Sequence, residues 1–106
     1  MGDVTFFFDT YALIEIYNGN KNYKNYKNVK IILSYFQLYE FYYNLMGESD
    51  KEEFMNFFNF LKNFCVELNF DWIPKASKLK QIYKKRSLSY TDCLGYIIAK
   101  ELGVKF

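Results

Sequence analysis

Three acidic residues in this sequence stand where they could act together on a phosphate group. Asp9 directly follows the apolar run VTFFF, Glu40 lies in a segment crowded with tyrosines, and Asp92 stands near the start of the last predicted helix. Carboxylates that cluster within about 4–6 Å disfavour one another's charge, so a cation is needed to offset the repulsion. An all-oxygen site suits Mg²⁺ or Mn²⁺, which orients water and stabilises a phosphoryl transition state.

The absence of histidine restricts the chemistry further. It excludes Ser–His and Cys–His nucleophilic catalysis, histidine-based acid–base cleavage and the usual zinc sites. The two cysteines, Cys65 and Cys93, fit no zinc spacing and are interpreted as reduced core thiols of a cytoplasmic protein. Catalysis would therefore depend on carboxylates, lysines, hydroxyls or a hard metal.

Two of the acidic residues also have an ordinary structural explanation. Asp9 lies between a predicted strand and a predicted helix, where aspartate is a favoured N-cap. Asp92 stands three residues after Ser89, which is a capping-box spacing with Asp in the place of Glu. Local pattern alone leaves both interpretations open.

Glu40 shares the narrow polar stripe of its predicted helix with Gln37 and Asn44. Solvent exposure would explain this stripe. The rest of the helix is unusually apolar, however, so the stripe is also compatible with the wall of a cleft.

Alternating strands and helices must position these side chains. Buried strands are predicted at 4–8, 29–34 and 66–70, and the start of a fourth at 104. Helices are predicted at 10–18, 35–46, 51–64, 74–86 and 90–102, with Gly19, Gly47 and Gly103 as their ending signals. This alternation predicts an α/β fold with a parallel sheet covered on both faces. The functional crevice of such sheets lies beyond the carboxyl ends of the strands, which Asp9, Glu40 and Asp92 can all approach.

The bulk composition supports a single domain outside the membrane. The chain has 106 residues, of which 51% are hydrophobic and 23% aromatic. It contains no run of about 18 apolar residues, and its first residues lack the basic region of a signal peptide. A cytoplasmic location without a membrane partner is expected.

Three segments resemble, in order, three signatures of PIN-domain nucleases, most closely the VapC-type toxins of toxin–antitoxin pairs. They are FFFDTYALIEI (6–16), ILSYFQLYEFYYNL (32–45) and LSYTDCLGYIIAKELGVKF (88–106). The first carries an Asp-Thr pair after a strand, the second a Ser followed by a helix with Glu, and the third a Leu-Ser-aromatic-small-Asp run.

The resemblance implies a single PIN-like domain over 1–106 with a three-layer α/β/α fold around a central parallel sheet. It implies a metal-dependent endoribonuclease in which Asp9, Glu40 and Asp92 are the catalytic residues and bind one or two Mg²⁺ or Mn²⁺ ions. A water activated by the metal would attack the phosphodiester in line and leave a 5′-phosphate. Thr10 and Thr91 would support the site through hydrogen bonds.

One departure from the family pattern affects this site. PIN domains usually carry a further acidic residue in a Thr-x-Asp-like turn after the next strand. Here the sequence ends at Phe106, so the C-terminal strand is expected to be truncated and the site to lack that ligand. A catalytically weak or inactive PIN-like module that binds RNA or protein is the alternative function. An interaction protein acting through its aromatic surface is a third.

Partners are suggested by charged and aromatic segments. Lys84, Lys85 and Arg86 are candidate RNA-binding residues because they lead directly into Asp92, whereas the lysines repeated through 21–30 also suit a solvated loop. Apolar surface on the helices at 35–46 and 54–64 predicts a homodimer or a groove for a cognate antitoxin.

Overall fold

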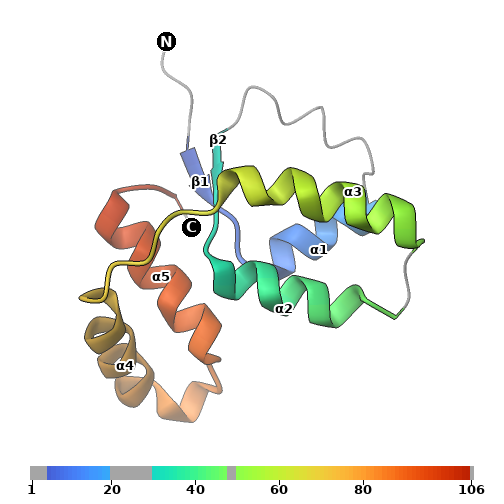
Figure 1. Ribbon diagram of the computed structural model, residues 1–106. Helices are drawn as coiled ribbons and strands as arrows, with labels where there is room; N and C mark the ends of the chain where they lie inside the picture. The colour runs from blue at the N-terminus through green and yellow to red at the C-terminus, as the bar shows by residue number, and fades with distance from the viewer. Residues whose placement is uncertain (1–4, 20–29, 48–49, 106) are drawn as a thin grey trace.

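A computed structural model describes residues 5–19, 30–47 and 50–105 of the chain (Figure 1). Most of the lysine-rich segment 20–30 therefore lies outside the described residues. Strand β1 (Thr5–Phe7) pairs in parallel with strand β2 (Lys30–Ile32), with Phe6 opposite Ile31. The expected α/β class with a parallel sheet is confirmed, although the sheet is small and the chain is mostly helical.

The strand predicted at 66–70 is wrong, because no ladder forms there and the nearest bridge lies one residue earlier. The segment expected to begin a fourth strand at 104 pairs in parallel with β1 at Lys105, and its last residue, Phe106, lies outside the described residues. Leu33 bridges to Cys65, and Phe6 bridges to Lys105. Beyond Cys65, the Asn69 side chain accepts a hydrogen bond from the Asp71 amide (2.8 Å) and turns the chain into the next helix. Such a local side-chain bond competes with a sheet ladder.

Five helices in the described part of the chain follow the predicted order. Their bounds are α1 Thr10–Gly19, α2 Tyr35–Leu45, α3 Lys51–Leu61, α4 Trp72–Ile82 and α5 Tyr90–Leu102. The helices predicted at 51–64 and 74–86 end earlier than expected and continue as 3₁₀ turns, η2 (Lys62–Phe64) and η3 (Lys84–Arg86).

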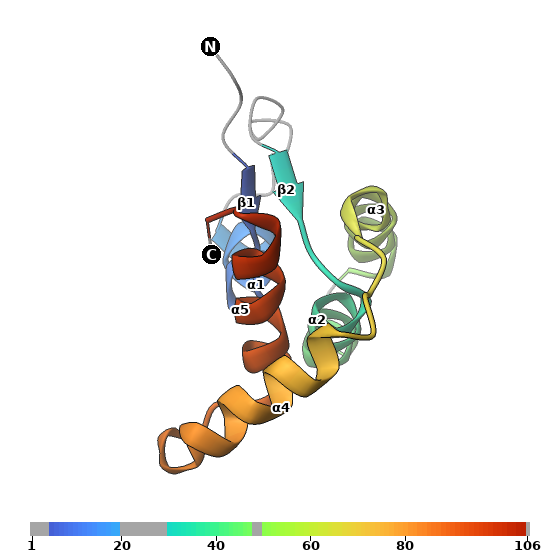
Figure 2. The same cartoon turned by 90° about the vertical axis from the view of Figure 1, so that its left-hand side faces the viewer.

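Alternating side chains of the two strands divide between two hydrophobic clusters. Ile31 and Leu33 join a cluster with α1, α2 and α3, whereas Phe7 joins a cluster with α4 and α5 and Ile32 packs against it. This follows from the pleat, which directs successive side chains to opposite faces. Figure 2 shows α5 beside β1, with α2 and α3 beyond β2.

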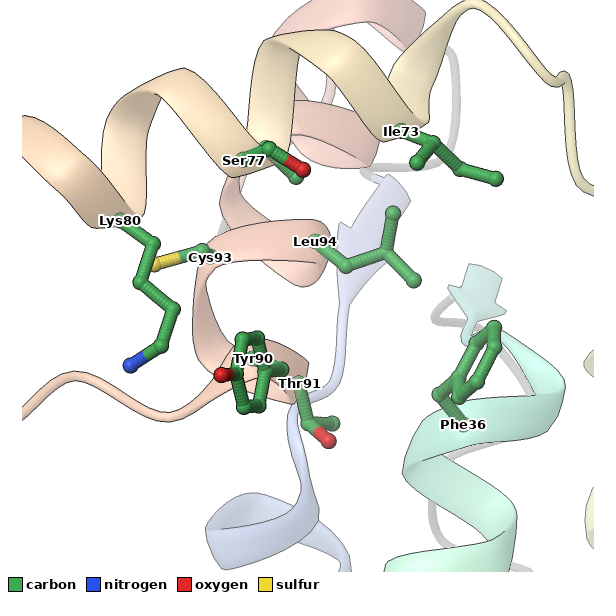
Figure 3. A pocket seen from close by; sticks show the side chains of 9 residues that line it. Phe36, Ile73, Ser77, Lys80, Tyr90, Thr91, Cys93 and Leu94 are labelled. Atoms are coloured by element: carbon green, nitrogen blue, oxygen red, sulfur yellow. The ribbon is translucent and has the colours of Figure 1, made fainter.

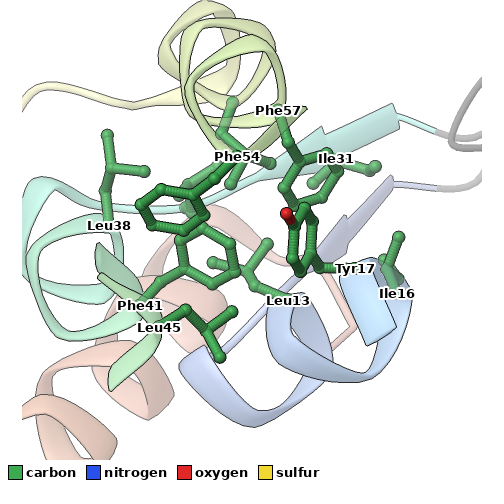
Figure 4. Close-up of a cluster of buried hydrophobic side chains, with 11 residues drawn as sticks. Leu13, Ile16, Tyr17, Ile31, Leu38, Phe41, Leu45, Phe54 and Phe57 are labelled. Carbon is green, nitrogen blue, oxygen red and sulfur yellow. The ribbon is translucent and has the colours of Figure 1, made fainter. Parts of the chain in front are cut away.

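Aromatic rings dominate the first cluster (Figure 4). Tyr17 of α1 lies within ring-contact distance of Phe41, Phe54 and Phe57, with centroid separations of 6.2, 5.8 and 5.3 Å. Pairs at these separations stabilise beyond their buried area. The apolar stripe expected on the helix at 51–64 therefore packs largely into the core.

Helix α5 ends in a Schellman motif that sets the direction of the C-terminal segment. Gly103 has a φ of 66°, its amide donates to the Lys100 carbonyl (3.2 Å), and the Val104 amide donates to the Ala99 carbonyl (2.9 Å). Because the Val104 amide is used in this way, the bridge to Phe6 starts only at Lys105. Gly19 has no positive φ, and it is simply the last residue of α1.

We expect Gly103→Ala to lower the free energy of unfolding by about 1 kcal/mol, because an L-residue is disfavoured in the left-handed conformation. Gly19→Ala is the matched control, since a Cβ there meets no atom within 4 Å and no positive φ is required. Urea denaturation of both variants measures the difference. Equal effects of the two substitutions would contradict this account of the α5 terminus.

Candidate functional site

Asp9 forms the N-cap of α1. Its Oδ1 atom accepts a hydrogen bond from the Ala12 amide (2.9 Å), and its carbonyl accepts one from the Leu13 amide (3.1 Å). The N-cap interpretation is therefore confirmed for this half-buried residue. No hydrogen bond to Oδ2 is seen within the described part of the chain, so this oxygen is open to a ligand.

Asp92 forms a capping box at the start of α5. Its amide donates to the Ser89 hydroxyl (2.9 Å), and its Oδ2 atom accepts from the Ser89 amide (3.3 Å). The capping-box interpretation is also confirmed. As with Asp9, one carboxylate oxygen serves the cap, and across residues 5–19, 30–47 and 50–105 the other has no hydrogen-bond partner.

These two carboxylates line one pocket with a volume of about 520 Å³, which we call the carboxylate pocket. Its lining residues are Asp9, Leu79, Tyr83, Arg86, Leu88, Asp92, Cys93 and Tyr96. Residues distant in sequence thus meet at the N-termini of α1 and α5. Of the three basic residues predicted to bind RNA, Arg86 lines this pocket, whereas Lys84 and Lys85 are exposed in η3 outside its lining.

Glu40 does not line the carboxylate pocket. It is half-buried on α2. Among the described residues, no group of three or more Asp, Glu, Cys or His side chains is arranged to hold a metal ion. The structure therefore brings together two of the three carboxylates on which the predicted site was based.

Gln37 explains how the two aspartates reach one pocket, and sequence reasoning missed this role. Its side chain is completely buried, and its Oε1 atom accepts hydrogen bonds from the amide (3.1 Å) and the hydroxyl of Ser34. Its Nε2 atom donates to the Thr91 carbonyl (3.0 Å), while its own carbonyl accepts from the Thr10 hydroxyl (3.5 Å). Thr10 and Thr91 are the neighbours of Asp9 and Asp92, so Gln37 fastens both helix N-termini to α2.

The polar stripe on α2 is therefore not uniform. Gln37 is buried, Glu40 is half-buried and Asn44 is exposed. Interpreting Gln37 as a residue of a cleft or of the solvated face was wrong, because its amide is used in the core. The available signal was the spacing from Ser34, since Gln at the third helical position completes a capping box.

Neither of the threonines predicted to support the site lines the carboxylate pocket. Thr10 is buried and directs its hydroxyl to the Gln37 carbonyl. Thr91 is half-buried and offers its carbonyl to Gln37. Both threonines contact α2, so their visible contribution is to position the neighbouring aspartates.

A second, apolar pocket of about 220 Å³ lies between α4, α5 and the start of α2 (Figure 3). Cys93 forms part of the wall of both pockets. Burial raises the pKa of its thiol, as does the nearby charge of Asp92, while Lys80 opposes the shift. A thiol that stays protonated is a poor nucleophile, so Cys93 is interpreted as a core residue. Both cysteines are free, as predicted.

A third depression lies between α2 and α3 and is called the tyrosine groove. It has a volume of about 500 Å³ and is lined by Tyr35, Leu38, Tyr39, Tyr42, Met55 and Phe58. Tyr35 and Tyr39 are exposed. The helices predicted to present apolar surface therefore do so at this groove.

The donor set of the carboxylate pocket fits a hard divalent cation. Asp9 and Asp92 each offer one oxygen that capping does not use, and both atoms are carboxylate oxygens. Mg²⁺ in proteins commonly takes one or two carboxylates and completes its octahedron with water and substrate phosphate. Two protein ligands predict weak binding, and Arg86 adds a positive charge to the same lining.

Comparison of the chain with models of protein families, with curated proteins and with solved structures finds no match in any of the three. Within the described residues, no helix has the length and apolar character needed to cross a membrane.

We expect Gln37→Ala to lower the free energy of unfolding by about 3 kcal/mol, because it leaves buried polar groups of Ser34 and Thr91 without partners. Asn44→Ala, on the exposed part of the same helix, is the control and should stay within about 0.5 kcal/mol of the wild type. Urea denaturation tests both. A Gln37→Ala protein as stable as the control would show that the bridge is unimportant.

We expect Mg²⁺ or Mn²⁺ at about ten times its dissociation constant to raise the melting temperature by about 5 °C. Asp9→Asn and Asp92→Asn should abolish the rise, because asparagine keeps the cap but loses the charge. Asp50→Asn is the matched control, since Asp50 caps α3 by the same kind of bond, to the Glu53 amide (3.0 Å), outside the carboxylate pocket. An equal rise in all variants would rule out this metal site.

Proposed function

We propose that this chain is a metal-dependent endoribonuclease of the PIN-domain type and that the carboxylate pocket is its active site. The single observation that supports the proposal is the convergence of Asp9 and Asp92 on one pocket that Arg86 also lines. Two carboxylates with an available oxygen each, next to a guanidinium, suit the cleavage of a phosphodiester.

The residues that line the pocket would have different roles in such a reaction. Asp9 and Asp92 would hold the cation through the oxygens that do not cap α1 and α5. Arg86 would bind the phosphate, because its planar guanidinium can donate two parallel hydrogen bonds to phosphate oxygens. The chemistry supplied by bound Mg²⁺ or Mn²⁺ is the activation of water and the stabilisation of charge on the phosphoryl group.

Glu40 differs from the two aspartates in its position. It lies on α2, whose first turn contacts α5 through Gln37, but its side chain is not part of the pocket lining. In the proposed PIN-like, three-layer arrangement, Glu40 would be the third carboxylate of the site. It would contribute when substrate is bound. Of the three carboxylates, only Asp9 and Asp92 line the pocket, so substitutions of these two residues test the active site.

The proposed biological role is that of a cytoplasmic toxin controlled by a cognate antitoxin. An aromatic groove on the outside of α2 and α3 supports a protein partner, because exposed apolar patches commonly mark such surfaces. The antitoxin or a second copy of the chain would occupy the tyrosine groove, and RNA would occupy the carboxylate pocket.

A catalytically inactive PIN-like binding module is the second candidate. It is favoured by one specific observation, namely that Asp9 and Asp92 both serve as helix caps while Glu40 lies outside the pocket lining. Such a module would still bind RNA through Arg86 but would not cleave it. The two functions differ in their dependence on metal.

We expect single-stranded RNA to be cleaved in Mg²⁺ or Mn²⁺ and to stay intact in chelator. Asp9→Asn and Asp92→Asn should each reduce the rate by about 100-fold or more, since the metal's charge stabilisation contributes several kcal/mol. Asp50→Asn should leave the rate unchanged. The rate is measured from the products on a denaturing gel.

Cleavage that persists in chelator, or that falls equally in all three variants, would refute the assignment of the active site. Absence of cleavage under every condition would favour the inactive module instead.

A further inference from the structure

We propose that the carboxylate pocket binds one unpaired nucleotide of an RNA strand, with its base on the rings of Tyr83 and Tyr96 and its phosphate on Arg86. This inference rests on the proposed function for its substrate class. It adds that the pocket selects single strands through two aromatic residues that were not among the predicted site residues.

The rings of Tyr83 and Tyr96 are much more exposed than those of the aromatic residues in the core. Tyr83 is 41% exposed and Tyr96 is 47% exposed, whereas Tyr17 in the first cluster is 5% exposed. Both rings line the pocket that contains the carboxylates. An aromatic ring that stays partly exposed at a pocket wall offers a face on which a nucleic-acid base can stack.

Arg86 stands beside one of these rings. Its guanidinium carbon lies 5.6 Å from the centroid of Tyr83, and its amide donates to the Tyr83 carbonyl (2.9 Å). The short turn η3 thus fixes the distance between a cation and a ring. The two groups are thus close enough for one ligand that carries both a base and a phosphate to contact both.

The path of the chain after Arg86 keeps this pair at the pocket. Ser87 adopts a left-handed conformation (φ 55°), which turns the chain from η3 toward the start of α5. Leu88 then lines the pocket, and Ser89 begins the capping box of Asp92. The same few residues therefore position the cation, the ring and one of the carboxylates.

The rest of the lining suits a base more than a simple anion. Leu79 and Leu88 provide apolar surface, and the volume of about 520 Å³ is within the ordinary range for sites that hold small organic molecules. Stacking on a protein ring needs a free base face, and a base inside a duplex has both faces covered by its neighbours. The pocket should therefore prefer a single strand.

The test measures binding by the full chain in chelator, so that no cleavage contributes. The probe is a fluorescein-labelled single-stranded RNA of about ten nucleotides, and anisotropy reports its dissociation constant. Tyr83→Ala and Tyr96→Ala should each weaken binding by about 5- to 100-fold. Tyr83→Phe and Tyr96→Phe should stay within about twofold of the wild type, because phenylalanine keeps the stacking face.

Two matched controls separate the pocket from general effects. Tyr43→Ala removes an exposed tyrosine of α2 that is not among the residues lining the carboxylate pocket, and it should bind like the wild type. Arg86→Ala should weaken binding and lower the slope of log K against log salt by about one, whereas Lys78→Ala, on the exposed face of α4, should change the slope less. Thermal unfolding checks that each variant is folded.

The outcomes distinguish this inference from the proposed catalysis. Wild-type binding by both Tyr→Ala variants, or equal affinity for duplex and single-stranded RNA, overturns the inference even if the chain cleaves RNA. Binding that depends on both tyrosines in a chain that never cleaves RNA supports the inference and refutes the catalysis. Loss of binding in the Phe variants as well as the Ala variants also overturns it, since stacking would then not be the cause.

Discussion

The arrangement of the site depends on one buried amide. Gln37 lies in the interior and uses both ends of its side chain, since Oε1 closes the cap of α2 at Ser34 and Nε2 reaches the backbone of α5 at Thr91. Its carbonyl also receives the hydroxyl of Thr10. A polar group in the core costs free energy unless each donor and acceptor is satisfied, so the N-termini of three helices are constrained to meet there. Asp9 and Asp92 are adjacent in sequence to the contacted threonines and are brought to one pocket as a consequence.

Capping and ligand binding are compatible in this pocket because a carboxylate has two oxygens. One oxygen of each aspartate accepts a hydrogen bond from a backbone amide, which fixes the side-chain rotamer. The remaining oxygen is thereby held in place before any ligand arrives, and such preorganisation lowers the cost of binding. The fold therefore maintains the pair with or without a cation.

The small sheet explains why surfaces around the site remain aromatic. Two three-residue strands with one bridge on each side present few side chains to each cluster, so the helices must supply most of the core. Phe41, Phe54 and Phe57 are buried in this way, but other aromatic residues of the same helices stay exposed. Tyr35 and Tyr39 of α2 line the tyrosine groove, and Tyr83 and Tyr96 line the carboxylate pocket. Some aromatic residues of this chain therefore stabilise the core, and others form exposed surfaces at the groove and the pocket.

The sequence by itself determined the order of elements and the end of α5 at Gly103, because these depend on local periodicity and on bonds within a few residues. It also offered the caps at Asp9 and Ser89 as one of two interpretations, and the alternation of elements predicted the parallel pairing of the first two strands. It did not determine that pairing around the segments predicted at 66–70 and from 104 is limited to single bridges at Cys65 and Lys105 among the described residues, since local turns at Asn69 and Gly103 compete with the ladder there. It also did not separate Gln37 from Glu40 on one polar stripe, distinguish Arg86 from Lys84 and Lys85, or place Tyr83 and Tyr96 beside the aspartates. Those features depend on contacts between residues far apart in the chain, and only the tertiary packing of α2, α4 and α5 decided them.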